Sequence, residues 1–327
     1  MRLLDVKNLC VEFPSSARTV RAVSGVDFEI RAGEIVGLVG ESGCGKTMTS
    51  LSVMGLLPPR ARVSGEVRYE DRDLLRLPPE KMRDIRGDRI SMIFQEPMSA
   101  LNPVLTVERQ ICEPLILHRG ASREEARAQA LDLLQLVQVP QARERLRAYP
   151  HQLSGGLCQR VMIAMALICQ PALLIADEPT TALDVTIQAQ ILSLLVDLRE
   201  RLGTTILMIT HDLGVVAELC ERVYVMYAGR VVESADVYTL FDAPLHPYTA
   251  GLMRSIPTMD DRAGGDALYS IPGMVPSLDD LPEGCAFAPR CPEARQACTA
   301  AVPPLLEIAA GRTVRCWKYG EGGGYDA

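Results

Sequence analysis

The segment Gly40–Thr47, with the pattern G-x-x-x-x-G-K-[ST], constrains this chain more than any other part of the sequence. An apolar run at residues 35–39 precedes it, and residues 48–54 have the composition of a helix. A strand, this loop and a helix, in that order, predict a phosphate-binding loop, or P-loop. The pattern would arise by accident with odds of about 1% in a chain of this size.

A P-loop predicts which atoms hold the phosphates. Its glycines allow successive backbone N–H groups to curl around the α- and β-phosphates. Lys46 is predicted to reach the β- and γ-phosphates, and the hydroxyl of Thr47 is predicted to ligate Mg²⁺. The residues predicted to contact the nucleotide in and after this loop are Gly40, Ser42, Gly43, Cys44, Gly45, Lys46, Thr47 and Thr49.

Composition limits the class of protein. The 327 residues are 48% hydrophobic, which suffices for one large or two modest domains. No apolar run approaches the roughly 18 residues that cross a bilayer, and residues 1–7 do not resemble a signal peptide, so we expect a cytoplasmic location. The formal net charge of −7 argues weakly against a nucleic-acid-binding protein.

Strand-like and helical segments alternate along the chain. Strands are predicted near residues 3–6, 22–30, 63–69, 89–94, 173–176, 205–209 and 223–227, and residues 97–170 are predicted to be mainly helical. A capping box at residues 122–125 begins one helix, and a helix at residues 185–201 should end at Gly203. This order predicts an α/β core with a parallel sheet. Near residue 257 helical periodicity is lost, which predicts domains at 1–256 and 257–327.

Two carboxylates follow the predicted strand at residues 173–176. Asp177 is predicted to hold Mg²⁺, and Glu178 to orient or deprotonate an attacking water. Without the P-loop, an ordinary acidic turn would be the better interpretation. Together, the P-loop and the carboxylate pair predict hydrolysis of a nucleoside triphosphate.

A second anion site is predicted at Ser154, Gly155 and Gly156, which open an apolar helix and offer free N–H groups at its positive end. Such a site in a chain with one P-loop suggests a nucleotide held by another subunit. Gln95 and His211 each follow a predicted strand, where they could contact Mg²⁺, water or the γ-phosphate. Alone, neither residue would indicate a function.

These motifs, together with Ala182-Leu183-Asp184, resemble the nucleotide-binding domain of ABC transporters over about residues 1–250. The resemblance implies a P-loop NTPase fold with a RecA-like core, an N-terminal β subdomain and an inserted helical subdomain at about 97–170. It also implies that two domains enclose two ATP molecules. Ser154 and Gly156 would then act on the partner's ATP, Glu178 on the water, and His211 on the γ-phosphate. Gln95 would join Thr47 and Asp177 around Mg²⁺ and couple the site to the membrane subunit.

The C-terminal part resembles the extension of oligopeptide/dipeptide permease ATP-binding subunits. The resemblance rests on Leu245–Met253, Ile271–Gly273, Gly284–Phe287 and Pro289–Pro292. It implies an ATP-hydrolysing motor subunit of an importer for di- or oligopeptides. The same subfamily includes nickel, glutathione and antimicrobial-peptide transporters, so the solute stays open.

Four of the ten cysteines, Cys285, Cys291, Cys298 and Cys316, lie near the C-terminal end. Their spacing is neither that of a zinc ribbon nor that of a ferredoxin. In a reducing compartment such a group more often binds metal than forms disulfides. Four thiolates suit a [4Fe–4S] cluster or zinc, and the resemblance favours the cluster; free core cysteines are the third alternative.

The resemblance also implies partners. These are a second ABC ATPase subunit, identical or a sister, two transmembrane permease subunits and, indirectly, an extracytoplasmic peptide-binding protein. The chain would lie peripherally on the cytoplasmic side of the inner membrane. A soluble ABC ATPase acting on nucleic acid is a second hypothesis, which the single domain and negative charge disfavour. A regulatory binding module is a third, which the presence of Glu178 and His211 disfavours.

Overall fold

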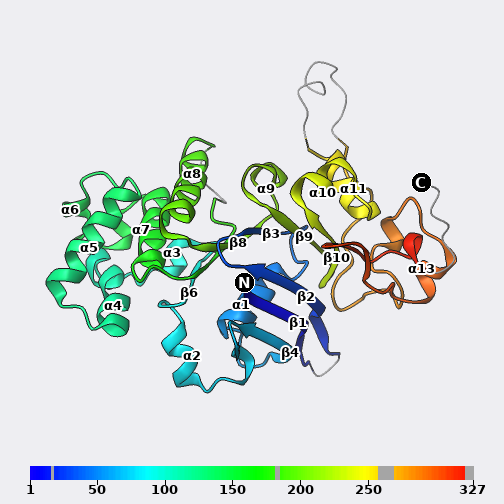
Figure 1. Ribbon diagram of the computed structural model, residues 1–327, viewed down its shortest axis with the longest axis horizontal. Helices are drawn as coiled ribbons and strands as arrows, with labels where there is room; N and C mark the ends of the chain where they lie inside the picture. Colours follow the sequence, from blue (N-terminus) through cyan, green and yellow to red (C-terminus); the bar gives the residue numbers. More distant parts are fainter. Residues whose placement is uncertain (16–17, 181–184, 257–268, 321–327) are drawn as a thin grey trace, which may run out of the picture. The chain divides into compact units, whose positions relative to one another are not determined.

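The computed structural model describes residues 1–15, 18–180, 185–256 and 269–320 (Figure 1). The chain divides into two compact units. Unit 1 contains residues 1–3, 30–34 and 76–209, and unit 2 contains residues 4–29, 35–75 and those from 210 onward. The predicted boundary at 256/257 borders residues 257–268, which lie outside the described residues, so the division into domains stays a prediction.

The sheet of unit 1 is parallel and fully buried. It contains β6 (Ile90–Ile93), β7 (Leu173–Asp177) and β8 (Thr205–Thr210). The register pairs Ile93 with Ala176 and Asp177 with Ile209, so the carboxyl ends of these strands meet at one edge. Continuous apolar strands of this kind are typical of a parallel sheet covered on both faces.

Helices make up most of the rest of unit 1. They are α2 (Pro79–Ile85), α3 (Pro97–Ala100), α4 (Val107–Arg119), α5 (Arg123–Leu136), α6 (Ala142–Arg145), α7 (Gly155–Leu167) and α8 (Val185–Leu202). Figure 1 shows α4, α5, α6 and α7 gathered in one group. The predicted helical region at 97–170 is confirmed, as is the capping box of Ser122 and Glu125. Among the described helices, none is both long and apolar enough to span a membrane.

Unit 2 contains an antiparallel sheet near the N-terminus. Its strands are β1 (Arg2–Phe13), β2 (Val20–Arg31), β4 (Arg62–Tyr69) and β5 (Arg72–Asp73), in the order β2-β1-β4-β5. Their alternating burial places one face on the core, as the sequence pattern predicted. The first two residues of β1 and the last two residues of β2 are assigned to unit 1.

The second sheet of unit 2 is mixed. Here β3 (Ile35–Val39) runs parallel to β9 (Arg222–Tyr227), and β10 (Arg230–Asp236) returns antiparallel to β9. The prediction of a parallel sheet is therefore right for β3 and β9, whereas β10, which was not predicted as a strand, runs antiparallel to β9. The cause is the two-residue turn of Ala228 and Gly229, whose φ angles of 45° and 79° reverse the chain in a tight hairpin.

The described residues of unit 2 contain further helices. They are α1 (Lys46–Met54), α9 (Leu213–Leu219), α10 (Val237–Asp242), α11 (Pro247–Arg254) and α13 (Gln296–Ala300), with 3₁₀ turns at Leu74–Arg76, Ala288–Arg290 (η3) and Trp317–Tyr319. A further 3₁₀ turn, Pro150–Gln152, precedes α7 in unit 1.

The C-terminal segment, by which we mean the described residues 269–320, extends the mixed sheet. The sequence did not predict this extension. Strand β12 (Arg312–Val314) pairs with β10, and β11 (Leu306–Ala309) pairs with β12. The Ser234 and Thr313 hydroxyls lie 2.8 Å apart in a hydrogen bond across this pair. Main-chain pairing therefore attaches residues 306–314 to β10, which pairs with β9, which in turn pairs with β3, the strand before the P-loop.

Val314, which is fully buried, gives a test of this attachment. Val314→Ala should destabilise the β10–β12 pairing by about 2 kcal/mol, because two buried carbon atoms are lost and a cavity remains. Hydrogen exchange of the β11 and β12 amides should accelerate. Glu307→Gln on the exposed face of β11 is the matched control, and equal exchange in both variants would contradict the pairing.

Candidate functional site

The P-loop in unit 2 has a backbone that only glycine permits at two positions. Gly40 and Gly45 have φ angles of 151° and 102°. A Cβ atom at Gly45 would lie 2.5 Å from the carbonyl oxygen of Ala22, and one at Gly40 would lie 2.2 Å from that of Met226. The loop is therefore pressed against β2 and the end of β9, and its shape requires both glycines.

Lys46 begins helix α1 and is 5% exposed. Its ammonium group donates to the carbonyl oxygens of Gly40, at 2.6 Å, and Glu41, at 3.1 Å. Because the loop closes around this charge, the positive end of α1 and the ammonium group lie together. This is the electrostatic arrangement that a bound triphosphate needs.

The other predicted P-loop contacts differ in exposure. Ser42 and Gly43 are exposed, and Thr47 is half-buried. Cys44 is buried, and burial raises the pKa of its thiol. The hydroxyl of Thr49 is buried and donates to the carbonyl of Gly45 at 2.9 Å. The Cys44 thiol is therefore shielded from solvent, and the Thr49 hydroxyl stabilises the first turn of α1.

Unit 1 brings two other predicted residues together. Gln95 follows β6 and Glu178 follows β7, and the Gln95 amide donates to the Glu178 carboxylate at 3.1 Å. The backbone N–H of Glu178 donates to Ile209 in β8 at 2.8 Å. Glu178 has a φ of 47°, a strained value for a residue with a side chain, and such strain often persists at functional sites. Asp177 is buried at the end of β7 and directly precedes Glu178 in the sequence.

The predicted second anion site also lies in unit 1. Ser154 caps helix α7, its hydroxyl accepting from the N–H of Leu157, and both Ser154 and Gly155 are exposed. No atom lies within 4 Å of a Cβ placed on Gly155, so the turn is open to solvent. Gly156 is half-buried. The helix N-terminus is therefore open to solvent, and its predicted role as an anion site stays a prediction.

Gln159 is a positioning residue that the sequence did not reveal. It lies one turn into α7, is 2% exposed, and its amide donates to the carbonyl of Pro179 at 2.7 Å. Pro179 directly follows Glu178, so α7 is bonded to the segment that carries the carboxylates. The predicted Ala182-Leu183-Asp184 contacts lie outside the described residues.

His211 belongs to unit 2 and is exposed. The next residue, Asp212, caps α9 by accepting from the N–H groups of Gly214 and Val215. This cap fixes the chain direction immediately after His211 and leaves the imidazole at the surface. Its predicted role at the γ-phosphate stays a prediction.

The four C-terminal cysteines of unit 2 line one small cavity of about 20 Å³. All ten cysteines of the chain lie in the described residues, and each is free. Within the described residues, no three His, Cys, Asp or Glu side chains are already arranged to hold a metal ion. Burial, and the charge of the neighbouring cysteines, raises the pKa of Cys291 to about 11. Once deprotonated to thiolates, four such side chains match the donor set of a soft metal centre, whose positive charge would offset their mutual repulsion.

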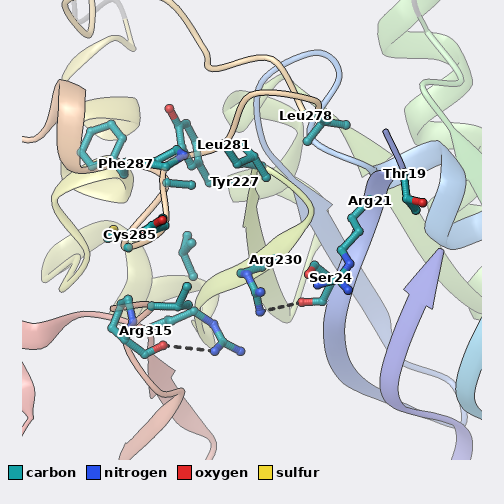
Figure 2. Close-up of a pocket in the computed structure, with 18 of the residues that line it drawn as sticks. Thr19, Arg21, Ser24, Tyr227, Arg230, Leu278, Leu281, Cys285, Phe287 and Arg315 are labelled. Atoms are coloured by element: carbon teal, nitrogen blue, oxygen red, sulfur yellow. Dashed lines mark hydrogen bonds between the residues drawn. The ribbon is translucent and has the colours of Figure 1, made fainter. Parts of the chain in front are cut away.

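A larger cavity of about 410 Å³ in unit 2 was not predicted (Figure 2). Figure 2 shows Arg230 and Arg315 on one side of it and the aromatic rings of Tyr227 and Phe287 on another. Arg230 donates to the carbonyl of Ser24, and Arg315 to those of Val231 and Pro303. These arginines tie β2, β10 and the C-terminal segment together.

Known protein families match both the N-terminal and the C-terminal parts of the chain. Residues 23–181 match the ABC transporter family, and residues 232–298 match the oligopeptide/dipeptide transporter C-terminal region. The oligopeptide transport ATP-binding protein AppD of Bacillus subtilis is 54% identical over 98% of this chain and 98% of its own length. The corresponding protein OppD of Escherichia coli is 49% identical over 97% of this chain and 93% of its own length.

Solved structures show the same fold. The ATP-binding cassette MJ0796, in a dimeric post-hydrolysis state bound to ADP and Pi, matches with a TM-score of 0.65 and 33% identity, covering 72% of this chain and 98% of that one. CbiO1 of Clostridium perfringens, part of a transporter complex, matches with a TM-score of 0.61 and 28% identity, over 74% of this chain and 91% of its own. The α/β cassette fold predicted from the motifs is confirmed.

Gly45 and Gly43 provide a matched test of the P-loop. Both have positive φ, but a Cβ at Gly43 would meet no atom within 4 Å, whereas one at Gly45 would collide with the Ala22 carbonyl. Gly45→Ala should therefore lower affinity for a fluorescent ATP analogue by at least about tenfold, and Gly43→Ala should have a smaller effect. Equal affinities for the two variants would show that close packing does not set the loop's shape.

Proposed function

The chain belongs to the family of ATP-binding subunits of peptide ABC transporters, and from this premise we propose that it is the motor subunit of a di- or oligopeptide importer. The observation that carries the proposal is that the similarity to AppD and OppD runs through both the ATP-binding cassette and the C-terminal region. Members of the ABC transporter family hydrolyse ATP, and this chain is an ATP hydrolase of that family.

We propose that hydrolysis takes place between two cassettes. The exposed Ser154 and Gly155 at the start of α7 are accessible to a nucleotide outside their own chain. The structure of MJ0796 is described as dimeric, which supports a two-cassette arrangement here. The second cassette would be an identical copy or, as the family resemblance suggests, a sister subunit.

We propose the individual roles from the family resemblance, and the chemistry of each residue supports them. Lys46 and the P-loop N–H groups bind the phosphates, while Thr47, Asp177 and Gln95 are the residues that would hold Mg²⁺. When bound, Mg²⁺ neutralises charge on the phosphate oxygens. Glu178, oriented by the amide of Gln95, aligns or deprotonates the attacking water, and His211 contacts the γ-phosphate.

Glu178→Gln tests this assignment. The variant keeps the shape of the side chain but loses its negative charge, so hydrolysis should fall by about 10²- to 10⁴-fold. ATP binding should persist, because the P-loop is unchanged, and dimers should accumulate in the presence of ATP. Turnover is measured by phosphate release and dimer formation by size-exclusion chromatography. Near-normal turnover would rule out Glu178 as the group that acts on water.

We further propose that the chain works with two membrane-spanning permease subunits at the cytoplasmic face of the inner membrane, fed by an extracytoplasmic binding protein. Isolation of the complex from membranes tests which subunits the chain binds, and reconstitution of that complex tests which solute it transports. A di- or oligopeptide with its binding protein should stimulate ATP hydrolysis by the reconstituted complex. Stimulation by nickel or glutathione alone would indicate that the chain serves a transporter for that solute. Copurified nucleic acid without permeases would contradict a role in transport.

We propose that Cys285, Cys291, Cys298 and Cys316 hold a [4Fe–4S] cluster, with zinc as the alternative. The support is that all four thiols line one cavity and each is free. When bound, such a centre would crosslink η3, α13 and the end of β12, a segment with little regular structure of its own.

Anaerobic purification tests the centre. Iron and acid-labile sulfide should be present in near-equal amounts, with broad visible absorbance, and Cys291→Ser should lose most of both. Cys169→Ser, which changes a buried cysteine of unit 1, is the matched control and should retain them. Zinc without sulfide would establish the alternative, and no metal at all would contradict the proposal.

A further inference from the structure

Arg290 of the C-terminal segment contacts the P-loop directly. Its guanidinium donates from Nη1 to Oε2 of Glu41 at 2.7 Å and from Nη2 to Oε1 at 3.1 Å. The Arg290 side chain is 5% exposed and that of Glu41 is 26% exposed. Two parallel hydrogen bonds to one carboxylate make the strongest and most directional form of ion pair. The contact joins residues 249 positions apart in sequence, both in unit 2.

Other bonds fix the guanidinium in place. Nε donates to the carbonyl of Pro272 at 3.1 Å, Nη2 to that of Ile271 at 3.3 Å, and Nη1 to the hydroxyl of Tyr227 at 3.3 Å. These partners come from the C-terminal segment and from β9. Because its donors are used in several directions, the arginine cannot turn away from Glu41 without losing buried bonds.

The backbone of Glu41 is held as well. Its N–H donates to the hydroxyl of Tyr248 in α11 at 2.9 Å, and its carbonyl accepts from the ammonium group of Lys46. Tyr248 is fully buried, with its ring 4.6 Å from that of Tyr227 and 5.5 Å from that of Phe287. Figure 2 shows Tyr227 and Phe287 together on the wall of the large cavity. An aromatic cluster thus supports the second residue of the P-loop.

The charge of Glu41 makes this contact important for nucleotide binding. Glu41 lies inside the P-loop, so an uncompensated carboxylate there would repel the phosphates and could withdraw the loop from its curled form. We propose that Arg290 is a positioning residue for the nucleotide site: it neutralises and anchors Glu41, and thereby makes ATP affinity depend on the C-terminal segment. The proposal rests on ATP binding by the P-loop and is independent of the transported solute.

The position of Arg290 links this contact to the cysteine cavity. Arg290 ends η3 and directly precedes Cys291, which lines that cavity. A change in the fold around the four cysteines would therefore move the arginine that holds Glu41. Through this connection, the state of the C-terminal segment would be transmitted to the P-loop.

The experiment measures binding of Mg²⁺ and a fluorescent ATP analogue to the full chain. Arg290→Ala should weaken binding by at least about 5-fold, the lower end of typical coupling between sites. Glu41→Gln combined with Arg290→Ala should bind more tightly than Arg290→Ala alone, because the repelling charge is gone. Arg312→Ala is the matched control, since Arg312 of β12 contacts the carbonyl of Ala243 and not the P-loop; its affinity should equal that of the wild type.

The outcomes separate the possible explanations. Unchanged affinity of a folded Arg290→Ala variant, or a double variant as weak as Arg290→Ala, would overturn the proposal. If Arg290→Ala does not fold by circular dichroism, Arg290→Gln replaces it in the same cycle; glutamine keeps a polar side chain of intermediate length but loses the positive charge. The same recovery by Glu41→Gln is then expected, and its absence overturns the proposal. A wild-type chain that fails to bind the analogue would instead contradict the proposed function.

Discussion

The close approach of the P-loop backbone to its neighbours determines how the nucleotide site is built. Gly45 lies against the carbonyl of Ala22 in β2, and Gly40 lies against that of Met226 at the end of β9. The loop therefore takes its shape from strands on both sides of it in sequence. Since β9 leads through the Ala228–Gly229 turn into β10, and β10 pairs with β12, the same contacts connect the P-loop with the C-terminal segment.

Much of this could be predicted from the sequence because its signals are local. The P-loop, the capping box at Ser122 and the apolar strand before Asp177 each depend on residues close together in the chain. Parallel strands place their carboxyl ends at one edge, so Gln95 and Glu178 could be expected to lie near each other, and they are hydrogen-bonded. The order of the motifs then sufficed to indicate the family.

The rest could not be predicted because it depends on contacts between distant residues. Arg290 and Glu41 are each unremarkable in sequence, and nothing local pairs them. Strands β11 and β12 are short and interrupted by polar residues, and they exist because β10 offers a free edge. Thr49 is one of the predicted nucleotide contacts, and nothing in the sequence indicated that its hydroxyl would donate to the carbonyl of Gly45. Side-chain direction within an element is set by packing, which a motif does not encode.

The positions of the anchoring residues explain why the C-terminal segment accompanies the cassette. The groups proposed to face phosphate lie on short loops at the ends of strands and helices, where local interactions alone would leave them free to move. Their supports come from elsewhere: Gln159 of α7 bonds to the residue after Glu178, and Arg290 and Tyr248 bond to Glu41. A loop held by buried, directional bonds loses less conformational entropy when a ligand binds. Under the proposal made above, Arg290 and Tyr248 would support ATP binding through their bonds to Glu41.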